Sequence, residues 1–313
     1  MAQTLTPELR NLLTQLSQQL QPDSDRNPPL LEVWDLWLQS LDLSPETRDS
    51  HYYPARRHIL KANNPLASDT TWFLGNSLAP KTYNERLWLL KRMAVWAVDE
   101  GLLSANPWLK IKPRKNIKKI VKPFSRDEAV RIIAGFDEIY PAISPFAQFL
   151  FLSGCRMSEA IGLRWSHVDF ECQEVCICES FVLRKDGGND YERIRKSTKT
   201  GSIRFLKMNA ELTKVFEQVS PARKNLEELV FKNQTGTNHI HCKTFSRCWK
   251  KVLAAANIPY RCPHTIRHSF ASHAIEQGTP LTGVAYLLGH SDTRMVAQTY
   301  GHLINRPSLP NIL

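Results

Sequence analysis

Apolar residues recur at helical spacing through the first hundred or so residues of the chain. Five leucines between residues 9 and 20 share one helical phase, and the stretch after them is rich in proline and aspartate. We therefore expect residues 1–28 to form a helical leader and a linker. From Leu30 the helical pattern returns, and it continues until Pro45 interrupts it.

A second long helix is predicted from its start signal. Thr82 and Glu85 stand three residues apart, as the N-cap and N3 residues of a capping box do. The apolar face that follows continues to Ala97, and Gly101 marks the expected end of the helix. Residues 29–112 are therefore predicted to form a small all-helical domain.

The segment after this domain is strongly basic. Between Gly101 and Ser125 there is no acidic residue, and seven basic residues occur: Lys110, Lys112, Arg114, Lys115, Lys118, Lys119 and Lys122. A charge run of this kind can be a solvated linker, or it can lie along a phosphate backbone, where each contact releases counterions. Between two domains of a basic protein we favour DNA contact, with residues 113–122 as the interdomain linker.

The second predicted domain covers residues 123–313 and combines helices with a few strands. Ser125 and Glu128 form another capping box, and helical spacing follows. Beyond Asp169 the pattern changes to alternation, with turn-rich loops between short apolar runs, which is typical of antiparallel strands. From Ala210 onward the pattern is helical again. The predicted fold class is mostly α with a small antiparallel β-sheet.

The C-terminal segment carries histidines, an arginine and a tyrosine on short predicted helices. His264 and Arg267 are three residues apart, so a helix that begins beside them places both on one face. Gly289 is expected to end the next helix and to leave His290 on a turn beyond it. Tyr300 then lies at the end of a further short helix.

Composition and charge favour an anionic polymer as partner. The 313 residues are 42% hydrophobic and 23% charged, and the formal net charge is +11. No apolar run approaches the roughly 20 residues that a membrane span requires, and the first residues lack the pattern of a secretory signal. Seven cysteines, an odd number, favour reduced thiols in a cytoplasm over a disulfide framework. The basic balance points to nucleic acid, although ribosomal and membrane-surface proteins share it.

Five short motifs follow one another along the second predicted domain. They are Gly154-Cys155-Arg156-Met157-Ser158-Glu159, Ser197-Thr198-Lys199-Thr200-Gly201, His264-Thr265-Ile266-Arg267-His268, Leu288-Gly289-His290-Ser291 and Thr299-Tyr300. In this order and at these intervals the motifs resemble those of the tyrosine recombinases, the phage-integrase-type site-specific DNA recombinases. The resemblance is weak over the helical domain and strong from residue 123 onward. It implies an N-terminal helical core-binding domain and a mixed α/β catalytic domain, which together grip duplex DNA.

The resemblance implies roles for the residues at the motif positions. Arg156 and Arg267 would bind the oxygens of the scissile phosphate, because guanidinium groups bind such oxygens bidentately and stay charged. His264 and His290 would donate hydrogen bonds to the same oxygens, and His264 could also accept a proton from the nucleophile. That nucleophile would be Tyr300, whose phenol needs a base or a cationic field because its ordinary pKa is about 10.

Three further positions would assist. Lys199, on a predicted hairpin, resembles the general acid that protonates the departing 5′ oxygen. Lys196 is close to it, and the register of the hairpin cannot be fixed from the sequence. Glu159 is expected to brace the arginines or a histidine, and His268 to be packed or hydrogen-bonded beneath the site.

The implied reaction makes a 3′-phosphotyrosyl link and releases a 5′ hydroxyl, and a partner strand then reverses the step. Because the link conserves the bond energy, no metal, ATP or other cofactor is expected, and the sequence has neither a P-loop nor carboxylates clustered for two metals. The implied partners are duplex DNA with specific recombination sites, a homo-tetramer on two duplexes and an accessory DNA-bending or directionality protein, with no membrane. Residues 301–313 would pack on a neighbouring subunit, and the expected location is cytoplasmic and nucleoid-associated.

Several other interpretations stay open at this stage. Without the other motifs, a tyrosine at the position of Tyr300 is most often a packed aromatic residue. Cys172, Cys176 and Cys178, with His167, suggest zinc, but their spacing fits no usual ligand pattern. A type IB topoisomerase, a DNA-binding regulator on a recombinase scaffold and a metal-dependent nuclease are the alternative functions.

Overall fold

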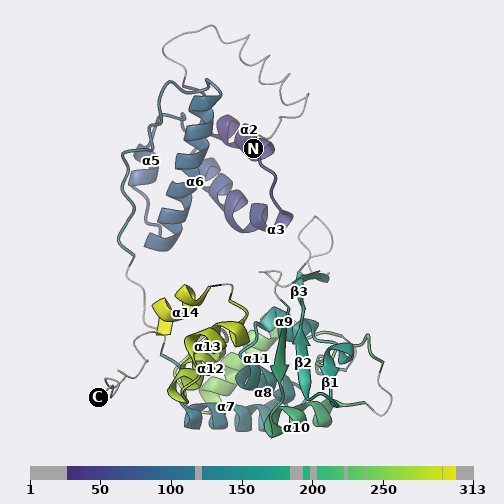
Figure 1. Ribbon diagram of the computed structural model, residues 1–313. Coiled ribbons are helices and arrows are strands. Elements are labelled where there is room, and N and C mark those ends of the chain that lie inside the picture. Colours follow the sequence, from purple (N-terminus) through teal and green to yellow (C-terminus); the bar gives the residue numbers. More distant parts are fainter. Residues whose placement is uncertain are drawn as a thin grey trace, which may run out of the picture. The chain divides into compact units, whose positions relative to one another are not determined.

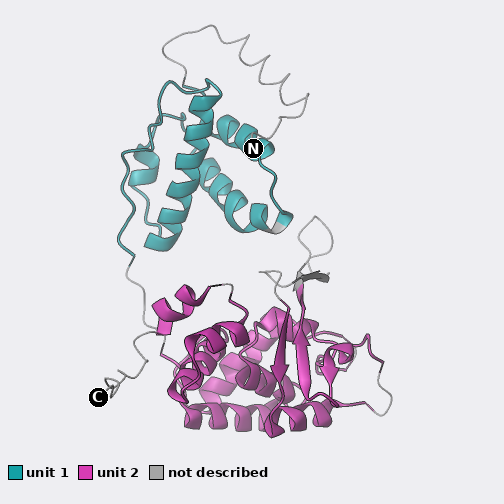
Figure 2. Cartoon of the chain, in the orientation of Figure 1, with its two compact units in different colours: residues 1–119, 184–190 teal, residues 120–183, 191–313 magenta. Residues whose placement is uncertain are grey.

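The computed structural model describes residues 27–116, 122–183, 193–197, 203–221, 225–236, 238–290 and 292–300. The chain divides into two compact units, unit 1 formed chiefly by residues 1–119 and unit 2 by residues 120–183 and 191–313 (Figure 2). The described part is rich in helices and contains two small antiparallel sheets (Figure 1), which confirms the predicted fold class. Among the described helices, none is both long and apolar enough to cross a membrane.

Unit 1 is built from helices. Its elements are α2 (Leu30–Ser40), α3 (Pro45–Thr47), a π-helical turn (Arg48–Tyr52), α4 (Tyr53–Lys61), α5 (Thr71–Leu74) and α6 (Pro80–Asp99). The start predicted for α6 was wrong. Pro80 takes the first helical position, where its missing N–H costs nothing, so Thr82 lies inside the helix and caps nothing. The predicted end near Gly101 is correct, because the helix stops at Asp99.

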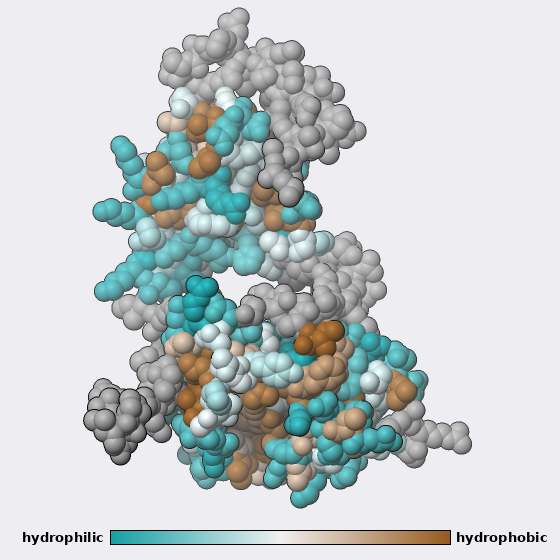
Figure 3. All heavy atoms as spheres, viewed as in Figure 1, coloured by the Kyte–Doolittle hydropathy of each residue, from teal (hydrophilic) through white to brown (hydrophobic). Residues whose placement is uncertain are grey.

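Aromatic rings fill the core of unit 1. The buried face of α2 repeats at helical spacing and consists of Leu30, Val33, Trp34, Trp37 and Leu38. The guanidinium of Arg56 in α4 donates two hydrogen bonds of 2.7 Å to the carboxylate of Asp35 in α2, which fixes the two helices against each other. On the face seen in Figure 3, hydrophilic side chains cover much of the described surface of this unit, with hydrophobic patches between them.

Unit 2 holds the remaining elements. The helices are α7 (Arg126–Ile139), α8 (Ser144–Ser153), α9 (Met157–Gly162), a 3-10 turn (Trp165–His167), α10 (Ala210–Val219), α11 (Cys242–Ala255), α12 (Thr265–Glu276), α13 (Leu281–Leu288) and α14 (Thr293–Tyr300). The strands are β1 (Val168–Asp169), β2 (Glu174–Ile177), β3 (Glu179–Leu183), β4 (Arg193–Ser197) and β5 (Arg204–Lys207). The predicted capping box opens α7, since Ser125 and Glu128 exchange hydrogen bonds of 2.9 and 3.1 Å.

The strands form two sheets rather than the single predicted one. One has the order β1-β2-β5 and the other pairs β3 with β4, all antiparallel. The alternation predicted for β2 is confirmed, because Val175 and Ile177 are buried while Glu174 and Cys176 are only partly covered. Val175 pairs with Leu206 of β5, so this sheet joins segments on both sides of the β3–β4 hairpin.

The chain turns sharply where α8 ends, and this turn begins the site. α8 packs against α7, α10 and α12. It ends at Gly154, whose φ of +63° is left-handed. A Cβ on Gly154 would lie 2.4 Å from the ring of Phe270 in α12, so a side chain is excluded by space as well as by backbone conformation. The turn brings Arg156 to the N-cap of α9, beside α12.

Candidate active site

Three arginine side chains from distant parts of unit 2 converge on the C-terminal end of α13. Each donates a hydrogen bond to one of three successive carbonyls, the pairs being Arg204 with Leu287 (2.9 Å), Arg267 with Leu288, and Arg156 with Gly289 (3.4 Å). The last carbonyls of a helix have no partner within it, and the negative end of the helix dipole stabilises nearby cations. The end of α13 therefore holds the three guanidinium groups together despite their like charge.

Of the three arginines, Arg267 makes the most hydrogen bonds to backbone carbonyls. It lies in the first turn of α12, is 5% exposed, and also donates a 2.9 Å hydrogen bond to the carbonyl of Gly154. Burial, and then the charge of Arg156, lower the pKa of Arg267 to about 10, which still leaves the group protonated at neutral pH. An anion bound beside it would meet a cation whose orientation is already set.

Glu159 forms the acidic centre of the cluster. One carboxylate oxygen accepts a 2.8 Å hydrogen bond from the guanidinium of Arg156, and the other accepts one of 2.7 Å from Arg204. Burial acts to raise the pKa of Glu159, but the hydrogen bonds and charges of the two arginines outweigh it and hold the pKa below its ordinary value. Glu159 thus holds the guanidinium groups of Arg156 and Arg204 on its two carboxylate oxygens.

Arg204 is a member of this cluster that sequence analysis missed. It is 1% exposed and enters from β5. The sequence does contain a signal for its burial. Positions in β5 are alternately buried and exposed, and Arg204 stands two residues before Leu206, on the buried side of the strand. An arginine at an inward position of a strand needs a buried partner, which here is Glu159.

The two histidines predicted to bind phosphate lie near enough to Arg267 and Arg156 for those charges to act on them. His264 is the N-cap residue of α12, and His290 follows Gly289, whose φ of +63° ends α13 as predicted. Burial, and then the charges of Arg267 and Arg156, lower the pKa of His264 and bring the pKa of His290 to about 4. Both imidazoles are therefore neutral at pH 7 in the free protein, and each has one N–H to donate.

Tyr300 ends α14 and turns its hydroxyl towards α12 of its own chain. It is 7% exposed and packs with apolar residues of α12, α13 and α14. Its hydroxyl is hydrogen-bonded to Nδ1 of His268. Burial raises the pKa of Tyr300 to about 12, although the charge of Arg267 acts in the opposite direction. His268, which was expected to be packed or hydrogen-bonded beneath the site, has the hydroxyl of the predicted nucleophile as its hydrogen-bond partner.

Lys199 lies outside the described residues, as do Lys118, Lys119 and residues 301–313. The hairpin register is described only as far as Ser197, the last residue of β4, and Lys196 stands opposite Ser180 there. The role of Lys199 as general acid therefore stays a prediction.

The basic segment at the end of unit 1 and the start of unit 2 contains two kinds of residue. Four of its lysines are exposed, namely Lys110, Lys112, Lys115 and Lys122. Arg114 differs from the expected phosphate contact, because its guanidinium donates 2.8 Å hydrogen bonds to the carbonyls of Leu78 and Asn76. The same guanidinium lies 3.9 Å from the centre of the Tyr83 ring. Its donors are thus largely used within unit 1.

The cysteines do not assemble a metal site in the described part of the chain. Within those residues, no group of three or more His, Cys, Asp or Glu side chains is arranged to hold an ion. The sulfur of Cys178 lies 3.5 Å from Nε2 of His167, and Cys172 is exposed on the loop before β2.

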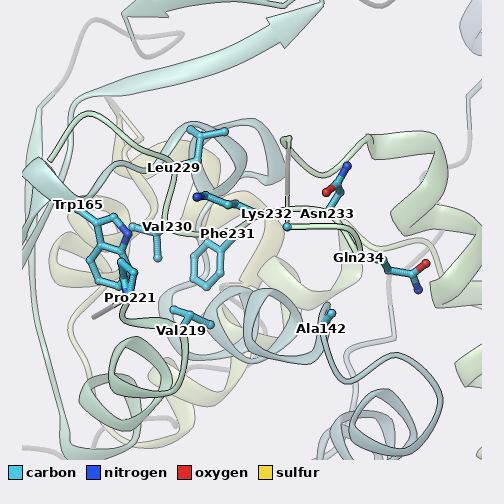
Figure 4. Close-up of a pocket in the computed structure, with 11 residues that line it drawn as sticks. Ala142, Trp165, Val219, Pro221, Leu229, Val230, Phe231, Lys232, Asn233 and Gln234 are labelled. Atoms are coloured by element: carbon cyan, nitrogen blue, oxygen red, sulfur yellow. The ribbon is translucent and has the colours of Figure 1, made fainter. Parts of the chain in front are cut away.

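A hollow of about 270 Å³ lies elsewhere in unit 2, between the end of α10 and the segment before α11. Figure 4 shows Trp165 and Pro221 at one side of it and Gln234 at the other. None of the predicted site residues lines this hollow, so it is separate from the arginine cluster.

Comparison with known proteins gives a family. The model of the phage integrase family matches residues 109–306. A tyrosine recombinase XerC-like protein of Caldanaerobacter subterraneus subsp. tengcongensis is 31% identical over 242 residues, which are 69% of this chain and 60% of that protein, less than two thirds of its length. The tyrosine recombinase XerD of Listeria monocytogenes is 24% identical over 271 residues, covering 82% of this chain and 86% of that protein.

Solved structures share the fold. The integrase of transposon Tn1549, in complex with transposon right end DNA, is 17% identical with a TM-score of 0.73 and covers 90% of this chain and 96% of its own. A lambda integrase tetramer bound to a Holliday junction gives 14% identity and a TM-score of 0.64, covering 94% of this chain and 83% of its own. At these identities the similarity is one of fold. Because the family model matches more than half of the sequence, the chain belongs to the phage integrase family of tyrosine recombinases.

Proposed function

We propose that this protein is a site-specific tyrosine recombinase that cuts and rejoins duplex DNA through a 3′-phosphotyrosyl intermediate. The observation that carries the proposal is the convergence of Arg156, Arg267, His264 and His290 in the unit that also holds the hydroxyl of Tyr300. Family membership supports the same reaction.

The proposed chemistry follows from the fixed charges. The phenolic oxygen of Tyr300 bonds to the scissile phosphorus and the bond to the 5′ oxygen breaks, so negative charge builds on the remaining phosphate oxygens. Arg156 and Arg267 stabilise that charge, and because their positions are set by helix carbonyls, little reorganisation is needed during the reaction. His264 and His290 add N–H donors. The departing 5′ oxygen takes a proton from Lys199, and attack by a 5′ hydroxyl of another strand reverses the sequence.

Each compact unit has a proposed part in DNA binding. Residues 29–112 form the helical core-binding domain, residues 113–122 are the basic linker, and residues 123–313 form the catalytic domain. We propose duplex DNA with specific sites as substrate and a homo-tetramer on two duplexes as the active assembly, for which the DNA-bound integrase structures give support. A cytoplasmic, nucleoid-associated location and an accessory DNA-bending or directionality protein belong to the same proposal.

The decisive experiment traps the covalent intermediate. Nicked duplexes tiled across the DNA that flanks the gene lose their short 5′-hydroxyl strand after cleavage, which prevents rejoining. We expect an SDS-resistant protein–DNA adduct with the natural protein and none with Tyr300→Phe, which keeps the ring and loses only the nucleophile. Adduct formation is expected to persist in EDTA, because fixed side-chain cations supply the charge. An adduct in Tyr300→Phe, or its loss in EDTA, would contradict the proposed chemistry.

The adduct assay and a plasmid relaxation assay together separate the alternative functions. A DNA-binding regulator would bind the duplexes and give no adduct. A type IB topoisomerase would relax a supercoiled plasmid of arbitrary sequence, whereas the proposed recombinase relaxes or recombines only plasmids that carry its site. The family assignment favours recombination over both.

The exposed linker lysines are expected to contribute binding without sequence information. In a triple variant, Lys110→Ser, Lys112→Ser and Lys115→Ser, the slope of log K against log salt concentration should fall by about 3, because each phosphate contact contributes about 0.9. Binding to a short duplex of arbitrary sequence, titrated at several salt concentrations, measures the slope. The matched control replaces three exposed lysines of α10 and α11: Lys214, Lys243 and Lys250. Equal slopes for both triple variants would show that the segment makes no special contact.

A further inference from the structure

The hydroxyl of Tyr300 has a defined partner in the free protein, and that partner is His268. The ring centroids of the two residues lie 5.7 Å apart, and the hydroxyl is hydrogen-bonded to Nδ1. His268 follows His264 by one helical turn on α12, and those two rings lie 5.1 Å apart, nearly perpendicular. The two histidines therefore continue one line of polar groups from the arginine cluster to the phenol.

We propose that His268 is a further catalytic residue, the base that takes the proton of Tyr300 as the phenolic oxygen attacks the phosphorus. The proposal rests on the proposed function and assigns separate roles to the two histidines of α12. His264, whose charge environment is set by Arg267 and Arg156, serves the phosphate. His268, which touches the phenol, serves the nucleophile.

Side chains of this protein can accept and donate every proton that the cleavage and rejoining steps require. The O–H bond of Tyr300 breaks as its oxygen bonds to phosphorus, and the proton passes to Nδ1 of His268. The bond from phosphorus to the 5′ oxygen breaks, and that oxygen takes a proton from Lys199 in the proposed mechanism. In the rejoining step the phenolate leaves phosphorus and recovers its proton from His268.

The surroundings of the pair explain why the proton stays on the phenol until DNA binds. Burial lowers the pKa of His268 to about 4, with further lowering from His264, Arg267 and His290. Burial also raises the pKa of Tyr300 to about 12. In the free protein both groups are therefore neutral, the phenol donates and Nδ1 accepts.

A bound phosphate changes this balance. Its negative charge beside Arg267 offsets the positive field that now disfavours imidazolium, so the basicity of His268 rises as substrate arrives. A base whose pKa approaches the working pH is the effective one. Proton transfer from Tyr300 to His268 therefore becomes more favourable when a phosphate occupies the arginine cluster.

The test replaces His268 by glutamine, which keeps a polar side chain but takes no proton, and by phenylalanine, which keeps a ring. His273→Gln is the matched control, because His273 lies on the same helix and contacts the carbonyl of Phe124 at 2.8 Å instead. On the trapped-intermediate duplex, both His268 variants are expected to form adduct about 10²–10³-fold more slowly at pH 7. The control should stay within about threefold, and DNA affinity should be unchanged in all of them.

The pH dependence separates a base from a structural support. Without the base, hydroxide must remove the phenol proton, so the rate of the His268 variants should rise about tenfold for each pH unit above 7 and approach the natural rate. A parallel fall at every pH would overturn the proposal, because it indicates lost positioning. Faster cleavage in the variants would also overturn it, because it would show that His268 restrains the nucleophile.

A measurement without DNA keeps this inference separate from the proposed function. With tyrosines labelled with ¹³C at Cζ, the resonance absent from Tyr300→Phe belongs to Tyr300. We expect His268→Phe to shift that resonance and His273→Gln to leave it in place. If the natural protein forms no adduct on any duplex, the proposed function fails, while an unshifted resonance refutes the His268 contact itself.

Discussion

Replacing Arg267 by lysine is expected to slow formation of the protein–DNA adduct by about 10³-fold, within the range that removal of a fixed cation costs in phosphoryl transfer. The charge is kept, so the loss comes from geometry. The guanidinium of Arg267 donates to the carbonyls of Gly154 and Leu288, and in the proposed mechanism it also binds a phosphate oxygen. An ammonium is a point charge with no planar fork, and it cannot satisfy both carbonyls and a phosphate oxygen in this arrangement.

Single-turnover adduct formation on the nicked duplex gives the rate, and duplex binding gives the affinity. Arg131→Lys is the matched control, because Arg131 is an exposed arginine of α7, paired with Asp127, and its change should alter the rate by less than about twofold. Because Arg267 is buried, circular dichroism must show that the variant is folded. Arg156→Lys, at a more exposed guanidinium, gives a second measurement of the same effect. A folded Arg267→Lys protein with near-natural rate would remove Arg267 from the mechanism.

The positions of several predicted site residues follow from local signals in the sequence, whereas the contacts between them depend on long-range packing. His264, Arg267 and His290 are placed by helix starts and ends, which the sequence encodes through glycine and helical spacing. The contact of His268 with Tyr300 joins α12 to α14. His264 and His268 lie one turn apart on α12, and their spacing does not predict which of them contacts a tyrosine on another helix.

The fold shows the same division between local and long-range information. The capping box at Ser125 was read correctly because both of its residues interact with each other. At Thr82 the same pattern failed, because Pro80 upstream had already started the helix. The split into two sheets depends on β2 pairing with β5 across the hairpin, and such register is decided by tertiary packing rather than by alternation.

Arg204 shows how a buried charge can be both a stability requirement and a positioning device. Its ion pair with Glu159 is 2.7 Å long, with the two side chains 2% and 1% exposed. Arg204→Met is expected to lower the free energy of unfolding by about 3–5 kcal/mol, because Glu159 would keep a buried charge with one partner fewer. Urea unfolding at pH 7 measures the change. The double variant Arg204→Met with Glu159→Gln should regain much of it, because neither buried charge of that pair remains.

The stability lost in Arg204→Met should depend on pH in a definite direction. The pKa of Glu159 lies below its ordinary value of 4.5, so its contribution to stability is present above that pH and is lost as the pH falls through the lower folded value. The difference in free energy of unfolding between the natural protein and Arg204→Met should therefore become smaller below pH 4.5. The histidines with lowered pKa values are present in both proteins, so their contributions largely cancel in this difference. A difference in free energy of unfolding that stays constant down to pH 3 would mean that the ionised pair of Arg204 and Glu159 contributes little to stability. The double variant then isolates positioning: it should fold well yet form adduct slowly, because Arg156 has lost the charged carboxylate that fixes its guanidinium for the proposed phosphate contact.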